Sequence, residues 1–204
     1  VSFEIKNNSN PDLFVIGPTI DASSGTLEFT SVENAHGSAI IRVAAIDDGN
    51  VPLQSPQSSF TIVVKPVNDT PETVADTATV SEDDSVLIDV LANDTDLDLD
   101  DNPSNFTVLS VSTPSVTGLT GPGTGTGSVV GNQVLFETGN DFDELDIGDE
   151  ATVTLQYTMS DSKGATSSNI ITTTVFGTND RPTAVADSAT VLENESVVID
   201  VLAN

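Results

Sequence analysis

The chain has 204 residues, 32 acidic and 5 basic, so its formal net charge at pH 7 is −27. It contains no cysteine, which excludes disulfide bonds, thiol catalysis and cysteine-ligated metals. Because five basic residues cannot neutralise a polyanion, nucleic-acid binding is not expected. No apolar stretch approaches the roughly 18–20 residues that span a bilayer, so membrane insertion is not expected either. A hydrophobic content of 37% exceeds that of a disordered acidic tail, and we expect a soluble, folded protein that binds calcium.

Along the chain, the hydrophobic pattern predicts strands. Apolar residues alternate with polar ones at Phe60, Ile62 and Val64, and again at Val86, Ile88 and Val90. The same period of two runs from Thr152 to Met159, as a half-buried strand requires. The Gly/Thr-rich run from Thr117 to Gly131 predicts a long flexible hairpin loop, and it lacks the Lys of phosphate-binding loops. No stretch carries the helical period.

An internal repeat organises the chain. Residues 68–93 match residues 179–204 at 18 of 26 aligned positions, with an offset of 111 residues. A unit of this size with short strands predicts an antiparallel β-sandwich. We predict three parts: the C-terminal part of one sandwich in residues 1–67, a complete sandwich in residues 68–178, and the first strands of the next copy in residues 179–204. Because the sequence begins at Val1, we expect it to be an internal segment of a longer protein.

The sequence offers little for catalysis. The single histidine, His36, lies in the polar segment Glu33–Gly37, which we predict to be an exposed turn. Tryptophan is absent and there is one tyrosine, so no aromatic platform for a sugar is evident, although paired carboxylates are plentiful. We predict that the chain is not an enzyme.

Five aspartates fall within eight residues: Asp94, Asp96, Asp98, Asp100 and Asp101. Two carboxylates about 4 Å apart repel by roughly 4 kcal/mol at an effective dielectric near 20. Two interpretations follow, a solvated acidic loop or a site for calcium, which prefers hard oxygen ligands. The spacing does not fit an EF-hand, because a loop that starts at Asp94 places Leu99 at its glycine position. Calcium ligands would therefore come from separate segments.

Several short motifs, in order, carry a family resemblance. They are AIDDGNVP at residues 45–52, VNDTP at 67–71, VSED at 80–83, DTD at 94–96, SD at 160–161 and NDRP at 179–182. In this order they resemble the cadherin-like repeats of large bacterial surface adhesins, of the VCBS and RTX-adhesin kind. The resemblance implies an all-β fold of tandem antiparallel Greek-key β-sandwich domains, cadherin-like and Ig-like, joined by short linkers.

The resemblance also implies Ca²⁺ sites at the junctions between successive domains. At the first junction the implied ligands are Asn68, Asp69, Asp94, Asp96 and Asp161, with Glu33 as an addition from the preceding domain. At the second junction they are Glu82, Asn179 and Asp180. Pro66 stands where the family has an Asp, which implies fewer ions than a full cadherin junction holds.

These expectations favour a calcium-rigidified extender segment of a secreted adhesin on a bacterial cell surface, acting in cell adhesion and biofilm formation. Its partners would be calcium ions and neighbouring repeats. One alternative is a module that binds a cell-surface glycan or protein, and another is an accessory domain of a secreted hydrolase. A tandem array favours the extender. We also expect head-to-tail self-association, in which residues 179–204 of one molecule pack on residues 1–67 of the next.

Overall fold

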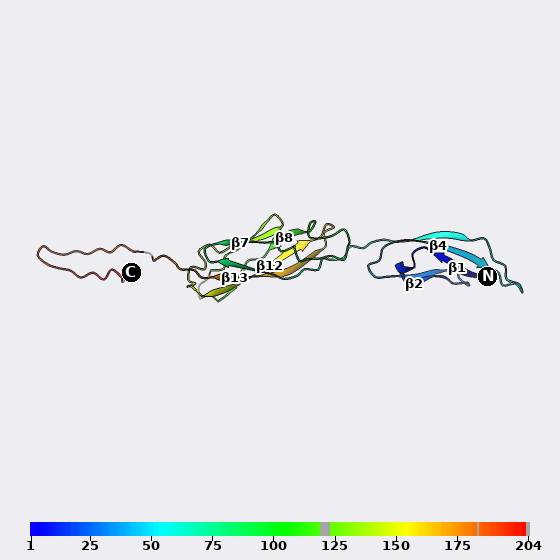
Figure 1. Ribbon diagram of the computed structural model, residues 1–204, viewed down its shortest axis with the longest axis horizontal. Helices are drawn as coiled ribbons and strands as arrows, with labels where there is room; N and C mark the ends of the chain where they lie inside the picture. Colours follow the sequence, from blue (N-terminus) through cyan, green and yellow to red (C-terminus); the bar gives the residue numbers. More distant parts are fainter. Residues whose placement is uncertain (119–122, 183, 203–204) are drawn as a thin grey trace. The chain divides into compact units, whose positions relative to one another are not determined.

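The computed structural model describes residues 1–118, 123–182 and 184–202, and its regular structure is almost entirely β-strand (Figure 1). The all-β prediction is therefore confirmed. Contacts divide the chain into two compact units. The first contains residues 1–71 with the loops 95–102 and 161–165, and the second contains residues 72–94, 103–160 and 166–204. Among the described residues, no helix has the length and apolar content needed to cross a membrane.

The first unit contains two small sheets. Its elements are β1 (Ser2–Asn8), the 3-10 helix η1 (Pro11–Leu13), β2 (Phe14–Ile20), β3 (Leu27–Ser31), β4 (Gly37–Ile46) and β5 (Ser58–Val64). One sheet has the order β1-β4-β5, all antiparallel, and the other pairs β2 with β3. Its core of buried apolar side chains is small, consisting of Leu13, Phe14, Ala39, Ile41 and Ile62. In β5, Ile62 is buried and Phe60 and Val64 are half-buried, which confirms the predicted alternation.

The second unit is a β-sandwich. Its strands are β6 (Asp76–Ser81), β7 (Ser85–Ile88), β8 (Thr107–Val111), β9 (Ser115–Thr117), β10 (Thr126–Val130), β11 (Gln133–Glu137), β12 (Glu150–Ser160) and β13 (Thr166–Phe176). One sheet has the order β10-β11-β7, and the other has the order β6-β13-β12-β8, with β9 also paired to β12. The predicted β-sandwich is confirmed, and its strand pairs are antiparallel except at one edge, where β6 runs parallel to β13.

The sandwich core follows from the alternation in β12. Ala151, Val153, Leu155, Tyr157 and Met159 are all buried, and the residues between them are more exposed. Successive side chains of a strand point to opposite faces, so one face of β12 packs against the other sheet. The strand predicted from Thr152 to Met159 is confirmed.

The Gly/Thr-rich run differs from its prediction as a loop. Residues Thr126–Val130 form β10, which pairs with β11 from Thr126 opposite Glu137 to Val130 opposite Gln133. A Cβ on Gly127 would lie 2.4 Å from the Leu155 side chain, so glycine lets this strand approach the core. Residues 119–122 of the run lie outside the described residues.

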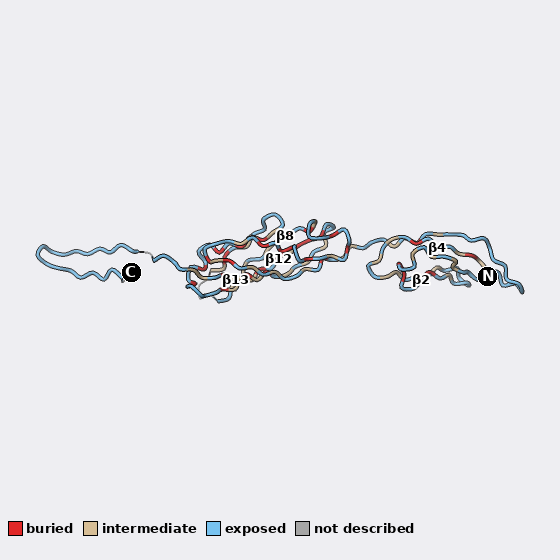
Figure 2. The backbone as a smooth tube through the Cα atoms, viewed as in Figure 1, coloured by how far each residue is buried: buried red, intermediate tan, exposed pale blue. Residues whose placement is uncertain are grey.

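The C-terminal segment lacks the predicted strands. Residues 184–202 are exposed and contain no assigned strand (Figures 1 and 2). A strand needs a partner for its backbone hydrogen bonds, and the described residues provide none here. The assignment of residues 179–204 to a further copy of the repeat stays a prediction.

Candidate metal centres

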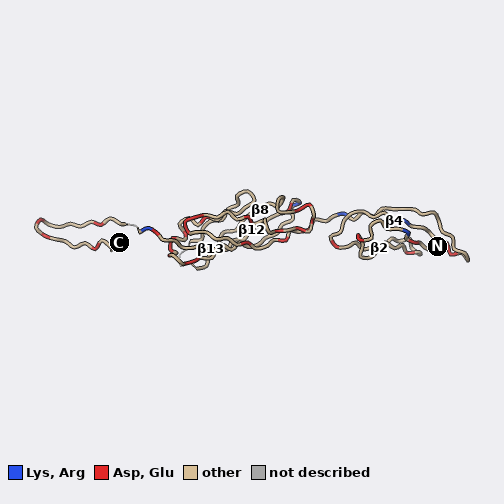
Figure 3. The backbone as a smooth tube through the Cα atoms, in the orientation of Figure 1, with Lys and Arg blue, Asp and Glu red and all other residues tan. Residues whose placement is uncertain are grey.

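Acidic residues gather in the loops at the ends of the strands (Figure 3). In the first unit, the loops 95–102 and 161–165 meet the segment that contains Asn68 and Asp69. We call this group the linker cluster; its members are Asn68, Asp69, Asp96, Asp98, Asp101 and Asp161. Asp98, Asp101 and Asp161 are buried, with 8%, 5% and 4% of their surface exposed.

Hydrogen bonds join the linker cluster. The Asn68 side chain donates to Asp161 Oδ2 at 2.7 Å, and the Asp69 N–H donates to Asp98 Oδ2 at 3.1 Å. The Asp98 N–H donates to Asp96 Oδ1 at 2.8 Å. Four of the residues expected at the first junction therefore take part in hydrogen bonds within the linker cluster. Sequence reasoning missed Asp98 and Asp101, although both stand in the aspartate-rich run.

Two acceptor atoms in the linker cluster are unsatisfied. Asn68 Oδ1 and Asp96 Oδ2 are buried and have no hydrogen-bond partner among the described residues. Burial, together with the charges of Asp98, Asp101 and Asp161, raises the pKa of Asp96. Buried acceptors of this kind are normally paired, and a cation would both satisfy them and relieve the repulsion.

The pKa of Asp161 shifts in the opposite direction to that of Asp96. Burial opposes its charge, but hydrogen bonds from Asn68 and from the N–H groups of Lys163 and Ala165 outweigh this effect and lower its pKa. Hydrogen bonds from Ser162, and secondarily from Lys163, lower the pKa of Asp101 as well. These hydrogen bonds therefore favour the ionised form of both carboxylates.

Lys163 already compensates part of the charge. Its Nζ lies 2.9 Å from Asp100 Oδ1, 3.0 Å from Asp101 Oδ2 and 3.6 Å from Asp98 Oδ2. Hydrogen bonds to Asp100 and Asp101 raise the pKa of Lys163. Lys163 is the single base in residues 68–178, and its position in the cluster was not predicted.

Asp94 belongs to the second unit. It is 1% exposed, and both of its carboxylate oxygens lie 3.0 Å from the Tyr157 hydroxyl, which donates to them. Its Oδ1 also accepts a hydrogen bond from the Val74 N–H at 2.8 Å. Burial raises the pKa of Asp94, and burial followed by the charge of Asp94 raises that of Tyr157. These contacts give Asp94 a structural role, and its role as a ligand stays a prediction.

Glu33 lies in a turn and is exposed. It lines a cavity of about 480 Å³ whose wall also contains Asp69 and Asp98 of the linker cluster. His36 lines the same cavity and is exposed, as predicted. Glu33 is therefore near the linker cluster, and its role as a ligand stays a prediction.

A second group, the base cluster, consists of Glu82, Asp83 and Asp180 in the second unit. One carboxylate oxygen from each lies within 4.8 Å of the others. Glu82 and Asp180 were expected together, whereas Asp83 was missed, although the sequence shows it directly after Glu82. Asn179, also expected here, is exposed and donates a hydrogen bond to the Asp180 carbonyl oxygen at 3.4 Å.

Glu82 is the buried member of the base cluster, with 0% of its surface exposed. Its Oε1 accepts hydrogen bonds from the N–H and the hydroxyl of Thr178. Its Oε2 is buried without a partner among the described residues. Burying a carboxylate is costly unless it is paired. Three converging carboxylates with one unsatisfied buried oxygen fit a hard divalent cation such as Ca²⁺.

A comparison of sequences shows the family of the chain. The family model described as bacterial Ig domain matches residues 68–174, more than half of the chain. The chain therefore belongs to the bacterial Ig domain family. Domains of this kind are typically extracellular, are found in adhesion-type proteins and are not typically enzymatic. No curated protein sequence matches the chain.

A comparison with solved structures finds similarity to cadherin ectodomains. Extracellular cadherin domains 1–4 of protocadherin gamma B7 have 18% identity and a TM-score of 0.48, with 87% of this chain and 42% of that chain covered. The human desmocollin-1 ectodomain has 10% identity and a TM-score of 0.34, with 95% of this chain and 37% of that chain covered. The chain thus spans less than half of each structure. At these TM-scores the likeness carries no argument about function.

Proposed function

We propose that the chain is an extender segment of a secreted bacterial surface adhesin, and that Ca²⁺ bound at the linker cluster and the base cluster rigidifies it. The motif order supports an adhesin of the VCBS and RTX kind, and family membership supports an extracellular setting. The sequence repeat supports an array of similar domains. A net charge of −27 means that an extended array without bound cations would repel itself.

The buried Glu82 carboxylate is the observation that carries the proposal. Thr178 donates to one of its oxygens, whereas the other has no hydrogen-bond partner among the described residues. The carboxylates of Asp83 and Asp180 lie close to it. Calcium accepts six to eight oxygen ligands in flexible geometry, whereas magnesium demands a smaller octahedron and keeps several waters. We therefore expect selectivity for calcium over magnesium.

Thermal unfolding with calcium, magnesium or chelator tests the proposal. Binding to the folded state alone adds about 2.7 kcal/mol of stability at a ligand concentration one hundred times Kd, so calcium should raise Tm clearly and magnesium less. The E82Q variant should lose a substantial part of the rise. The matched control D12N removes the same charge at an exposed position and should keep the full rise. An equal calcium response in E82Q and D12N would contradict the assignment of Glu82.

A further inference from the structure

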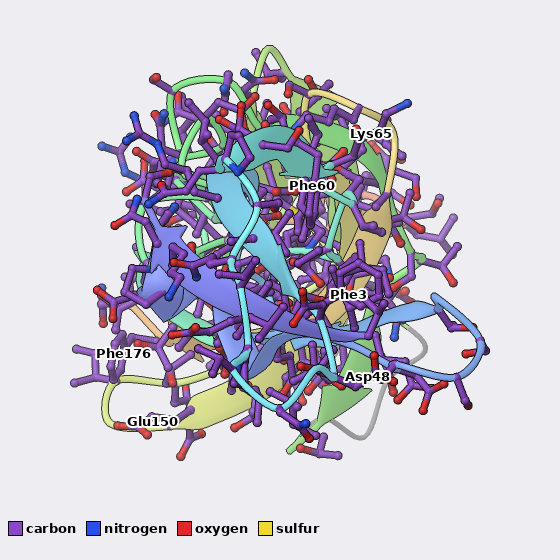
Figure 4. The ribbon with its side chains drawn as sticks, turned by 90° about the vertical axis from the view of Figure 1, so that its right-hand side faces the viewer. Phe3, Asp48, Phe60, Lys65, Glu150 and Phe176 are labelled. Carbon is purple, nitrogen blue, oxygen red and sulfur yellow. The ribbon has the colours of Figure 1, made fainter. Side chains whose placement is uncertain are left out.

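The base cluster lies where two distant segments of the second unit meet in parallel. The strand β6 pairs with β13 so that Ser81 lies opposite Phe176, which are the last residues of the two strands. Phe176 is labelled in Figure 4. The Glu82 N–H donates to the Phe176 carbonyl oxygen at 3.0 Å. This hydrogen bond extends the pairing beyond the strands, so it fixes the backbone of Glu82 beside the residues that follow β13.

Thr178 is the residue that meets the Glu82 side chain there. Its N–H and its hydroxyl both donate to Glu82 Oε1, the hydroxyl at 2.9 Å. The same hydroxyl lies 3.2 Å from Asp83 Oδ2, to which it also donates. One hydroxyl thus bridges two neighbouring carboxylates whose charges would otherwise drive them apart.

The contacts of Thr178 determine which oxygen of Glu82 can bind an ion. Thr178 occupies Oε1, whereas Oε2 is buried and has no hydrogen-bond partner among the described residues. One carboxylate oxygen from each of Glu82, Asp83 and Asp180 lies within 4.8 Å of the others. Ligands that are held in place before binding lose less conformational freedom when the ion arrives. The Thr178 hydroxyl therefore supplies part of this order in advance.

We propose that Thr178 is a positioning residue for the cation of the base cluster. Its hydroxyl orients the carboxylates of Glu82 and Asp83, and it acts through them rather than as a ligand. This inference rests on the proposed function and deepens it, because it names the group that organises the site. Loss of a partner that orients metal ligands typically weakens metal binding by about tenfold to a hundredfold.

The internal repeat contains the substitution that isolates the hydroxyl. By the offset of 111 residues, Thr178 corresponds to Val67, and each of the two residues directly precedes an Asn-Asp pair. Valine is also branched at Cβ and carries a methyl group in place of the hydroxyl. The backbone N–H of residue 178 can still donate to Glu82 after the change. T178V therefore removes the bridge between the carboxylates without a large change in side-chain shape.

Calorimetric titration of the full chain with calcium tests the proposal. The component of binding that E82Q removes reports the base cluster. For this component, T178V should bind calcium about tenfold more weakly than wild type or worse, whereas T178S keeps the hydroxyl and should restore most of the affinity. T178A also lacks the hydroxyl and should match T178V, so the test does not depend on the folding of one variant. The matched control T172V removes a hydroxyl from another half-buried position and should bind like wild type.

The outcomes separate a positioning role from a structural one. A hydroxyl that only stabilises the fold would lower Tm in chelator and leave the calcium affinity of the folded protein unchanged. Calcium binding that E82Q weakens and T178V does not would overturn the role of Thr178 and leave the proposed function standing. T178S that binds as weakly as T178V would overturn the role as well. Calcium binding that E82Q leaves unchanged would overturn both proposals for the base cluster.

Discussion

The two clusters differ in the groups that compensate their negative charge: a lysine in the linker cluster and hydrogen-bond donors in the base cluster. In the linker cluster, the Lys163 ammonium lies within 3.6 Å of Asp98, Asp100 and Asp101. In the base cluster, the Thr178 N–H and hydroxyl donate to Glu82, and no cation pairs with it among the described residues. If calcium binds both clusters, it must compete with Lys163 in the first and meets no such competitor in the second.

Replacing Lys163 should therefore strengthen calcium binding. In K163M the linker cluster loses its internal cation. Because the Lys163 side chain is 40% exposed and an ion pair open to solvent contributes about 1 kcal/mol or less, we expect an affinity gain of roughly fivefold. Calorimetric titration measures this gain. The control K65M removes the same charge from an exposed lysine near the linker. Equal affinities in the two variants would show that Lys163 does not occupy the cation site.

Asp76 gives the sandwich a pH dependence. Burial, followed by the charge of Asp94, raises the pKa of Asp76 to about 6, whereas an unfolded aspartate titrates near 3.9. The folded state thus binds a proton more tightly, so this contribution to stability is complete below about pH 4 and is lost as pH rises through about 6. In chelator, D76N should melt higher than wild type at pH 8, and the difference should vanish near pH 4. A difference that stays constant between these pH values would contradict the assignment.

Asp94 illustrates what sequence alone could not resolve. Its place in the DTD motif predicts a metal ligand, yet its carboxylate bonds to Tyr157, 63 residues away in sequence. We expect D94N to lose about 1.5–3 kcal/mol, the typical contribution of a hydrogen bond to a charged group. Because the role is structural, Tm should fall equally with calcium and with chelator. A loss confined to calcium-containing buffer would restore Asp94 as a ligand.

At the scale of strands, the alternation of apolar and polar residues was sufficient to predict strands that bury one face. It predicted β5 and β12, whose inward residues are apolar and whose outward residues are largely polar. It missed β10, because three glycines between residues 123 and 127 indicate a loop. There the glycines permit close packing, since a Cβ on Gly125 would lie 2.7 Å from the Phe136 ring. Parallel pairing of β6 with β13 depends on distant residues and leaves no local pattern.

The residues of the linker cluster could likewise be predicted only in part from the sequence. Short motifs mark Asn68, Asp69, Asp96 and Asp161 as candidates, and the hydrogen bonds between these segments depend on the turns that follow β12 and precede β8. Asp98, Asp101 and Lys163 were missed because their side chains enter the linker cluster only after those turns form. Lys163 follows Asp161 by two residues, and its backbone N–H donates to that carboxylate at 2.9 Å. The tight turn places the ammonium over the aspartates.

We expect that the residue after β13, Gly177, cannot be replaced by a larger residue without a loss of stability. A Cβ there would lie 2.2 Å from the Asp146 carbonyl oxygen and 2.8 Å from that of Leu145, and both atoms belong to the backbone. Overpacking of this kind costs about 1–3 kcal/mol, so G177A should be destabilised by that amount in chemical denaturation. The control G17A adds a Cβ that has nothing within 4 Å and should change stability by less than about 1 kcal/mol. Equal stability of the two variants would contradict this packing.

At the scale of the whole molecule, the relevant features are the negative charge and the repeat along the chain. The family match covers residues 68–174, and the repeat extends the same sequence pattern beyond that unit. Clusters of carboxylates near each Asn-Asp-x-Pro segment would repel without a cation and would be drawn together by one. We therefore expect calcium to restrict motion along the chain, while the folds of the individual units persist in chelator.

Small-angle X-ray scattering of the full chain, with calcium and with chelator, tests this claim most directly. We predict that the calcium profile fits one conformation and that the chelator profile requires a broad ensemble with a different radius of gyration. Circular dichroism should show the same strand content in both buffers. Superimposable scattering profiles at saturating calcium and in chelator would contradict calcium-dependent rigidity.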